Sequence, residues 1–125
     1  MPVQLNHTII HASDRDATAT FLTEILGLPE AGTYGPFRVV EVANDVSLDV
    51  MQDTGAISPQ HYAFLVSEEE FDAIFTRIKE RGLDYAADPM NNQPGEINTN
   101  DGGRGVYWDA PDGHRLEIIT VPYGG

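Results

Sequence analysis

The chain has 125 residues, of which 41% are hydrophobic, and it carries a formal net charge of −13 at pH 7. This length fits one domain with its own core. The negative charge argues against nucleic acid or an anionic membrane as a partner, because both attract basic surfaces. No Cys occurs, which excludes disulfides and fits a reducing compartment. The sequence has no signal peptide or membrane-length apolar run, so we expect a cytoplasmic protein.

The first half of the sequence alternates a strand, a helix and two further strands. Ser13 or Asp14 can cap the helix, and Gly27 can end it. Two Pro and two Gly in residues 29–36 indicate an irregular connection. The predicted elements are a strand over 5–12, a helix over 14–26, and strands over 37–43 and 46–52.

The same order of elements restarts after a linker over residues 53–60. Ser67 followed by Glu70 forms a capping box, which predicts a helix that ends at Gly82. Residues 88–104 are rich in Asn, Asp, Gly and Pro, and a long irregular loop of this kind is commonly functional. The other predicted elements are a strand over 61–66, a short strand over 83–87, and a closing hairpin from Gly105 to Ile119 that turns at Pro111-Asp112-Gly113.

The repeated order of elements predicts an internal duplication. His7 and His61 lie 54 residues apart and begin the first strand of each half, while Asp49 and Glu117 lie in the last strand of each half. If the halves pack about a pseudo-twofold axis, these four side chains can converge on one cleft. Two His and a carboxylate with open positions favour non-haem Fe(II), and the same donors suit Mn, Zn, Ni or Co.

The whole chain resembles the vicinal oxygen chelate superfamily, which includes glyoxalase I, extradiol dioxygenases, fosfomycin-resistance enzymes and bleomycin-binding proteins. The motifs that carry the resemblance are Leu-Asn-His7, His61-Tyr-Ala-Phe and Asp109-Ala-Pro-Asp-Gly-His-Arg-Leu-Glu117. The resemblance implies a single α+β domain over 1–125. Two tandem βαβββ modules, about 3–53 and 60–122, would form a curved mixed-sheet half-barrel around a metal cleft. It also implies a homodimer.

The resemblance further implies that His7, His61 and Glu117 are metal ligands. Asp49 has the place of a fourth ligand in glyoxalase I, although it is one methylene shorter than the Glu usual there. It can therefore be a weak ligand, a general base or an inert polar residue. The three-ligand set is similar to that of the dioxygenase and fosfomycin-resistance branches, so we expect Fe2+ or Mn2+, with Zn2+, Ni2+ or Co2+ as alternatives.

Four residues are weaker candidates for the site. Tyr123 near the metal could act as an acid or base. Arg104, in a Gly-Gly-Arg-Gly run, could anchor an anionic substrate group, although that run is also typical of a flexible turn. Tyr107 and Trp108 could line the pocket, because ligand sites are mostly apolar, or they could pack in the core or at its rim.

Two further His residues are expected to lie outside the ligand set. His11 is on the same strand face as His7 but about 13 Å further along the strand, so it cannot bind the same ion through that strand. We interpret it as structural or as an outer-shell residue. His114, next to the hairpin turn, is predicted to lie at the surface.

We therefore expect a metal-dependent enzyme that acts on a small molecule. The leading hypothesis is a non-haem Fe(II)-type dioxygenase acting on a chelating, catechol-like substrate. The alternatives are a glyoxalase-like lyase or isomerase and a fosfomycin-type thiol transferase. A fourth alternative, from another functional class, is a non-catalytic protein that sequesters a drug or metabolite.

Overall fold

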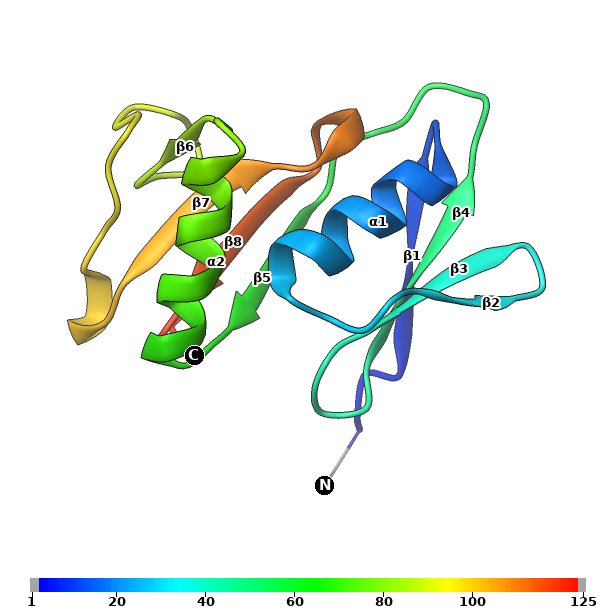
Figure 1. Cartoon of the computed structure of the whole chain (residues 1–125), viewed down its shortest axis with the longest axis horizontal. Coiled ribbons are helices and arrows are strands. Elements are labelled where there is room, and N and C mark those ends of the chain that lie inside the picture. Colours follow the sequence, from blue (N-terminus) through cyan, green and yellow to red (C-terminus); the bar gives the residue numbers. More distant parts are fainter. Residues whose placement is uncertain (1–2, 124–125) are drawn as a thin grey trace. The chain divides into compact units, whose positions relative to one another are not determined.

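The computed structural model describes residues 3–123. The chain divides into two compact units, with the boundary between Ser58 and Pro59. We call these units module 1 and module 2. Each has one α-helix and one four-stranded mixed sheet (Figure 1), which confirms the expected α+β architecture of two βαβββ modules. No helix within residues 3–123 is long and apolar enough to cross a membrane.

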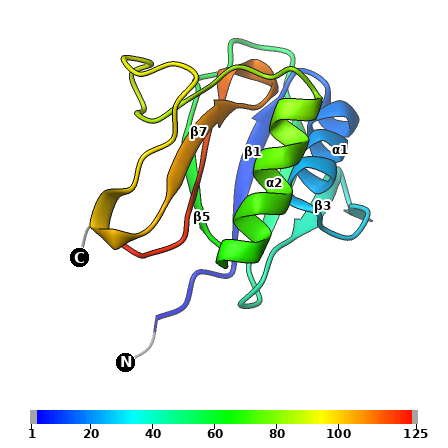
Figure 2. The same ribbon diagram turned by 60° about the vertical axis from the view of Figure 1, so that its left-hand side comes forward.

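Module 1 has the strand order β1-β4-β3-β2, in which only the β1–β4 pair is parallel. α1 packs on one face of this sheet (Figure 2). The Asp14 carboxylate caps it by accepting the Ala17 N–H at 3.0 Å, and Gly27 ends it with a φ of 71°. The elements are β1 (His7–Ala12), α1 (Arg15–Leu26), β2 (Gly32–Tyr34), β3 (Phe37–Glu41) and β4 (Ser47–Gln52).

β2 lies inside residues 29–36, where we predicted only an irregular connection. It pairs antiparallel with β3, from Gly32 opposite Val39 to Tyr34 opposite Phe37. All three of its residues are exposed. An exposed edge strand leaves no alternation of buried and polar residues in the sequence, so the pattern that revealed the other strands is missing here.

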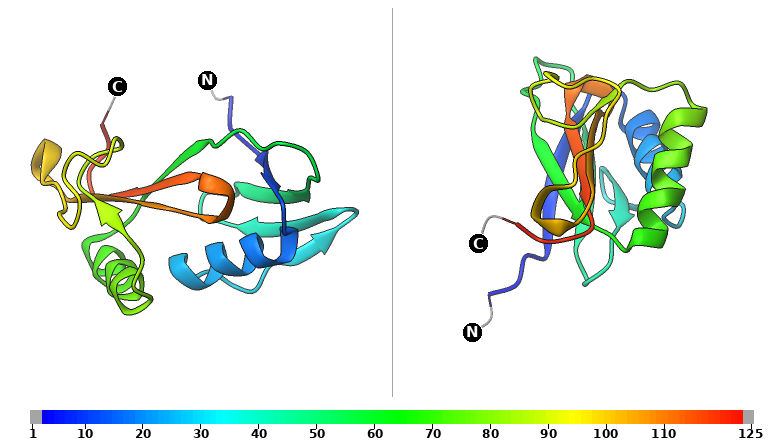
Figure 3. Two further views of the ribbon diagram at one scale, coloured as in Figure 1. Left: turned by 90° about the horizontal axis from the view of Figure 1, so that it is seen from above. Right: turned by 90° about the vertical axis from the view of Figure 1, so that its left-hand side faces the viewer.

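Module 2 repeats the arrangement with the strand order β5-β8-β7-β6, and the β5–β8 pair is parallel. α2 lies along one face of this sheet (Figure 3). The predicted capping box is confirmed, because Ser67 Oγ accepts the Glu70 N–H at 3.1 Å and Glu70 accepts the Ser67 N–H at 2.8 Å. The elements are β5 (His61–Leu65), α2 (Glu68–Glu80), β6 (Tyr85–Ala86), η1 (Asn100–Gly102), β7 (Gly105–Asp109), η2 (Pro111–Gly113) and β8 (Arg115–Ile119).

The strand register makes the two modules equivalent around the predicted ligands. In module 1, Ile9 lies two residues after His7 on β1 and pairs with Asp49 of β4. In module 2, Ala63 lies two residues after His61 on β5 and pairs with Glu117 of β8. Because side chains alternate along a strand, each His shares a sheet face with the carboxylate of its own module. Asp49 therefore has the same place in module 1 as Glu117 has in module 2.

Candidate metal centre

His61 and Glu117 form a bonded pair on one face of the module 2 sheet. The His61 Nε2 and Glu117 Oε1 atoms lie 2.9 Å apart, on neighbouring parallel strands. The Glu117 side chain is only 1% exposed, whereas that of His61 is 43% exposed. A buried carboxylate is costly unless it is hydrogen-bonded or coordinates a metal. The pair thus combines a desolvated anion with an imidazole that a ligand can reach.

Two tyrosines surround the Glu117 carboxylate. The Tyr123 hydroxyl donates to it, at 2.9 Å from Oε1 and 3.0 Å from Oε2. Tyr107 is its cross-strand neighbour on β7, and the Tyr107 ring meets the His61 ring edge-on at 5.8 Å. Burial, followed by hydrogen bonds with Tyr123 and Glu117, raises the pKa of Tyr107 above its usual range. The hydrogen bond with Tyr107 lowers the pKa of Tyr123, but burial and Glu117 outweigh it and raise that pKa. Both phenols therefore remain proton donors at neutral pH.

The equivalent pair of module 1 has different partners. Asp49 accepts the Ser47 hydroxyl at 3.0 Å, and His7 Nδ1 lies 2.7 Å from Asn6 Oδ1. His7 and Asp49 both line a cleft of about 680 Å3 in this module. Since His7 is exposed and Asp49 is half-buried, both can be reached from this cleft.

The geometry of the module 2 pair fits a divalent metal ion. Two donors that each lie about 2.1 Å from an ion, at right angles, are about 3.0 Å apart. The 2.9 Å between His61 Nε2 and Glu117 Oε1 is close to this value, and it is also the length of an ordinary hydrogen bond. Imidazole and carboxylate also suit Fe, Mn and Zn. Within residues 3–123 no group of three or more His, Asp or Glu side chains that could hold a metal ion is found. The assignment of His7, His61 and Glu117 as metal ligands therefore stays a prediction.

Arg104 is held by α2. Its Nε donates to Glu68 Oε1 at 2.8 Å, its guanidinium lies 2.9 Å from Asp72, and its Cζ lies 4.2 Å from the centre of the Phe71 ring. Two carboxylates therefore already balance its charge. Arg104 also lines a cavity of about 100 Å3 that Glu117 borders. Its predicted role as a substrate anchor stays a prediction.

The other aromatic and imidazole candidates lie in distinct environments. Trp108 is 0% exposed, in the core on the opposite sheet face from Tyr107. The prediction that His114 lies at the surface is wrong, because it is 1% exposed and its Nδ1 accepts the Gln60 N–H at 3.0 Å. The η2 turn brings His114 against Gln60, the residue just before β5. His11 pairs with Asp53 at 3.2 Å, as a structural residue would.

Sequence reasoning missed Arg115, which shares the sheet face of Glu117. Its guanidinium donates to Asp109 at 2.9 Å, to the Asp88 carbonyl at 3.2 Å and to Asn91 Oδ1 at 2.8 Å. It thus joins the start of the 88–104 loop to β7 and β8. The alternation of Arg115 with Glu117 was visible in the sequence, but its loop partners were not.

Asp88 organises the start of this loop, and its replacement by Ala is expected to loosen residues 88–95 while β5–β8 stay folded. Its carboxylate accepts the N–H groups of Met90, Asn92 and Gln93 at 3.2, 2.9 and 2.7 Å. We expect amide hydrogen exchange in 88–95 to rise about tenfold at neutral pH. Asp84→Ala, an exposed acidic residue of the same module, is the matched control. Equal exchange in both variants would contradict this assignment.

Acid should have the same effect as this substitution. The hydrogen bond from Asn92, together with those from Gln93 and Met90, holds the pKa of Asp88 below its usual value, although burial acts to raise it. A carboxylate whose folded-state pKa is depressed stabilises the fold above the ordinary value of about 3.9, and this contribution is lost as the pH falls through the lowered value. Amide NMR signals of the loop should therefore shift only in that acidic range.

Residues 4–118 match the family model described as "Glyoxalase/Bleomycin resistance protein/Dioxygenase superfamily". The chain belongs to this superfamily. Among solved structures it is similar to "Oxidase ChaP-H1", with 67% identity and a TM-score of 0.97 over 99% of this chain and 100% of that one. It is also similar to "Oxidase ChaP-H2", with 62% identity and a TM-score of 0.96 over 100% and 98%. It is 28% identical to "Metallothiol transferase FosB" of Shouchella clausii (strain KSM-K16), over 93% of this chain and 79% of that protein.

Proposed function

We propose that this protein is a metal-dependent oxidoreductase of the dioxygenase type, acting on a small chelating, catechol-like substrate. His7, His61 and Glu117 would hold Fe2+ or Mn2+. The observation that carries the proposal is the buried Glu117 carboxylate, 2.9 Å from the accessible His61 imidazole. Two relatives with identities of 67% and 62% are named oxidases, which supports the same reaction class.

A bound divalent ion would supply a Lewis acid for two neighbouring substrate oxygens and, as iron, a centre for O2 chemistry. The protein's own residues then have separate roles. Tyr123 holds both carboxylate oxygens of Glu117 and so fixes the direction of that ligand. Asp49, which borders the 680 Å3 cleft beside His7, would accept a proton from a substrate hydroxyl.

A fosfomycin-type thiol transferase is the second candidate, because relatives at 28% identity carry the names "Metallothiol transferase FosB" and "Glutathione transferase FosA". Fosfomycin is anionic. A net charge of −13 and the two carboxylates already bound to Arg104 work against an anionic substrate. We therefore rank this candidate below the oxidoreductase. A glyoxalase-like lyase, a sequestering protein and the homodimer remain predictions from the resemblance.

The test is elemental analysis of protein purified without a metal-chelating column, together with the variants His61→Ala and His11→Gln. We expect near-stoichiometric Fe or Mn in the wild type and in His11→Gln, and loss of the metal in His61→Ala. Oxygen consumption with catechols then tests the reaction. Zn, Ni or Co with the same dependence would favour thiol-transfer or isomerase chemistry. A folded wild type that neither holds nor takes up a metal would contradict the proposal and favour a sequestering protein.

A further inference from the structure

The β2–β3 hairpin of module 1 lacks the usual source of stability for an edge strand. β2 pairs with β3 alone, over three residue pairs, and its residues Gly32, Thr33 and Tyr34 are all exposed. Burial of apolar area cannot hold such a strand, and its ladder with β3 has only three residue pairs. Side-chain hydrogen bonds to its backbone can therefore fix its position.

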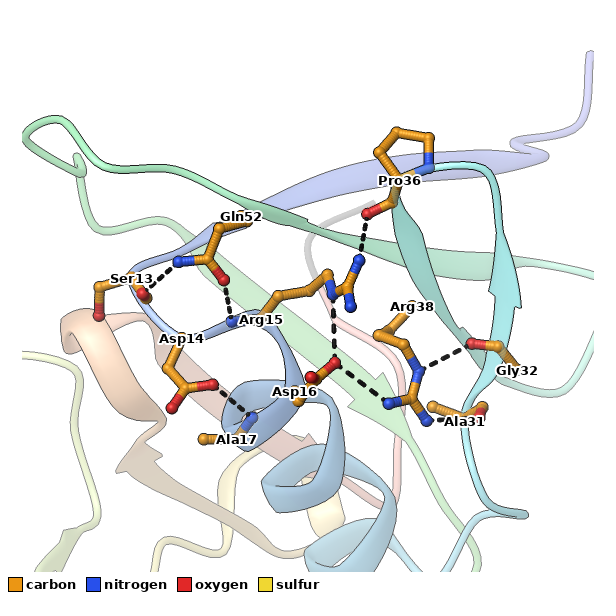
Figure 4. A network of polar contacts seen from close by, with 10 residues as sticks. All are labelled: Ser13, Asp14, Arg15, Asp16, Ala17, Ala31, Gly32, Pro36, Arg38 and Gln52. Atoms are coloured by element: carbon orange, nitrogen blue, oxygen red, sulfur yellow. Dashed lines mark hydrogen bonds and ion pairs between the residues drawn. The ribbon is translucent and has the colours of Figure 1, made fainter.

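Two arginines bind backbone carbonyls at both ends of β2 (Figure 4). Arg38 of β3 donates from Nε to the Gly32 carbonyl at 3.1 Å and from a terminal nitrogen to the Ala31 carbonyl at 2.8 Å. Arg15, the first residue of α1, donates to the Pro36 carbonyl at 2.8 Å. Ala31 and Gly32 lie at the entry to β2, and Pro36 lies in the turn that joins β2 to β3. The two guanidinium groups thus hold the start of the strand and the turn that follows it.

Asp16 joins the two arginines, as Figure 4 shows. Its Oδ1 accepts from Arg15 Nε at 3.1 Å and from an Arg38 terminal nitrogen at 3.1 Å. Asp16 lies in the first turn of α1, where the helix dipole favours an anion. The start of α1 is itself joined to β4, because Gln52 accepts the Arg15 N–H at 2.9 Å and donates to the Ser13 carbonyl. The hairpin is therefore joined to the start of α1 and, through Gln52, to the end of β4.

The same hairpin forms a wall of the cleft that contains His7 and Asp49. The residues it contributes are Gly32, Thr33, Tyr34, Phe37 and Val39. The Tyr34 side chain is 74% exposed, so its position depends on where the backbone of β2 is held. A displacement of β2 changes the space beside His7 without touching a predicted ligand.

We propose that Arg38, Asp16 and Arg15 are positioning residues that hold the β2–β3 hairpin in place and thereby set the space available to a ligand beside His7. The ligand part of this inference rests on the proposed function, whereas the positioning part does not. Arg38 suits the role because its planar guanidinium donates from three separate nitrogens to three fixed acceptors, whereas the three donors of a Lys ammonium share one nitrogen.

The first experiment measures hydrogen exchange in the peptide that spans 32–39, in Asp16→Asn and Arg38→Lys. We expect exchange there to rise about tenfold in both variants, with α1 and β4 unchanged. Asp45→Asn removes the same charge from the β3–β4 turn and should leave the peptide as in the wild type. Asp16→Glu, which keeps the charge, should recover part of the protection. Unchanged exchange in Asp16→Asn and Arg38→Lys would overturn the proposal.

The second experiment measures binding of 4-nitrocatechol to the metal-loaded protein by its absorption spectrum. We expect Asp16→Asn and Arg38→Lys to weaken binding by about fivefold to tenfold at an unchanged metal content. A loosened hairpin with unaltered affinity would overturn its role as a ligand wall. If the metal-loaded wild type does not bind 4-nitrocatechol, the proposed substrate class and the ligand part fail together. The exchange measurement still decides the positioning part on its own.

Discussion

Replacing Glu117 with Gln is expected to lower the affinity for a divalent metal on the order of 100-fold, with little loss of fold. Gln has nearly the same shape, but its neutral amide is a much poorer ligand than a carboxylate. Tyr123 can still donate to the amide oxygen, and the side chain stays in the same buried position. Metal content by elemental analysis and the melting temperature by circular dichroism measure the two parts separately.

Asp49→Asn is the matched control, because the register gives Asp49 the same place in module 1. We expect it to keep its metal within a few-fold of the wild-type affinity, since the shorter Asp49 side chain already accepts a hydrogen bond from Ser47. Equal metal loss in both variants would make Asp49 a fourth ligand. Unchanged metal content in Glu117→Gln would exclude Glu117 from the ligand set.

Trp108→Ala is expected to lower the free energy of unfolding by about 3–5 kcal/mol without changing the metal content of the protein that remains folded. Trp108 is 0% exposed and shares its sheet face with Leu116, which is also fully buried. Removal of the indole leaves a cavity that the surrounding sheet and helix can fill only in part. Urea unfolding followed by circular dichroism measures the loss.

Leu65→Ala is the control for this second prediction, because Leu65 is 61% exposed and lies in the same sheet. Its effect on the free energy of unfolding should stay within about 0.5 kcal/mol. If Trp108→Ala instead unfolds at the wild-type urea concentration but loses affinity for a ligand, Trp108 lines the site after all. This pair of variants thus separates a core role from a pocket role.

The elements with a strong local signal were predictable from the sequence. The Ser67–Glu70 capping box marked the start of α2, because both of its hydrogen bonds are made within one turn. The offset between His7 and His61 revealed the duplication. The repeated order of elements also anticipated the equivalence of Asp49 and Glu117, because each lies in the last strand of its half.

The environment of each candidate side chain was decided only by the tertiary structure. The sequence left Arg104 as either an anchor for an anionic substrate group or part of a flexible turn, but its partners Glu68 and Asp72 come from a helix more than thirty residues earlier. His114 lies beside a turn, where exposure is the usual expectation, yet the chain entering β5 covers it. Contacts between segments far apart in the chain leave no periodic pattern in either segment.

Local patterns in the sequence predicted the duplicated strand–helix–strand order and the donor types that suit a divalent metal. The shared face of each His and its carboxylate, the burial of Glu117 at 2.9 Å from His61, and the meeting of Arg15 and Arg38 at Asp16 follow from the packing of the chain. Periodicity and capping act over a few residues, so the sequence records them directly. Burial and hydrogen bonds between distant segments depend on the packed chain as a whole.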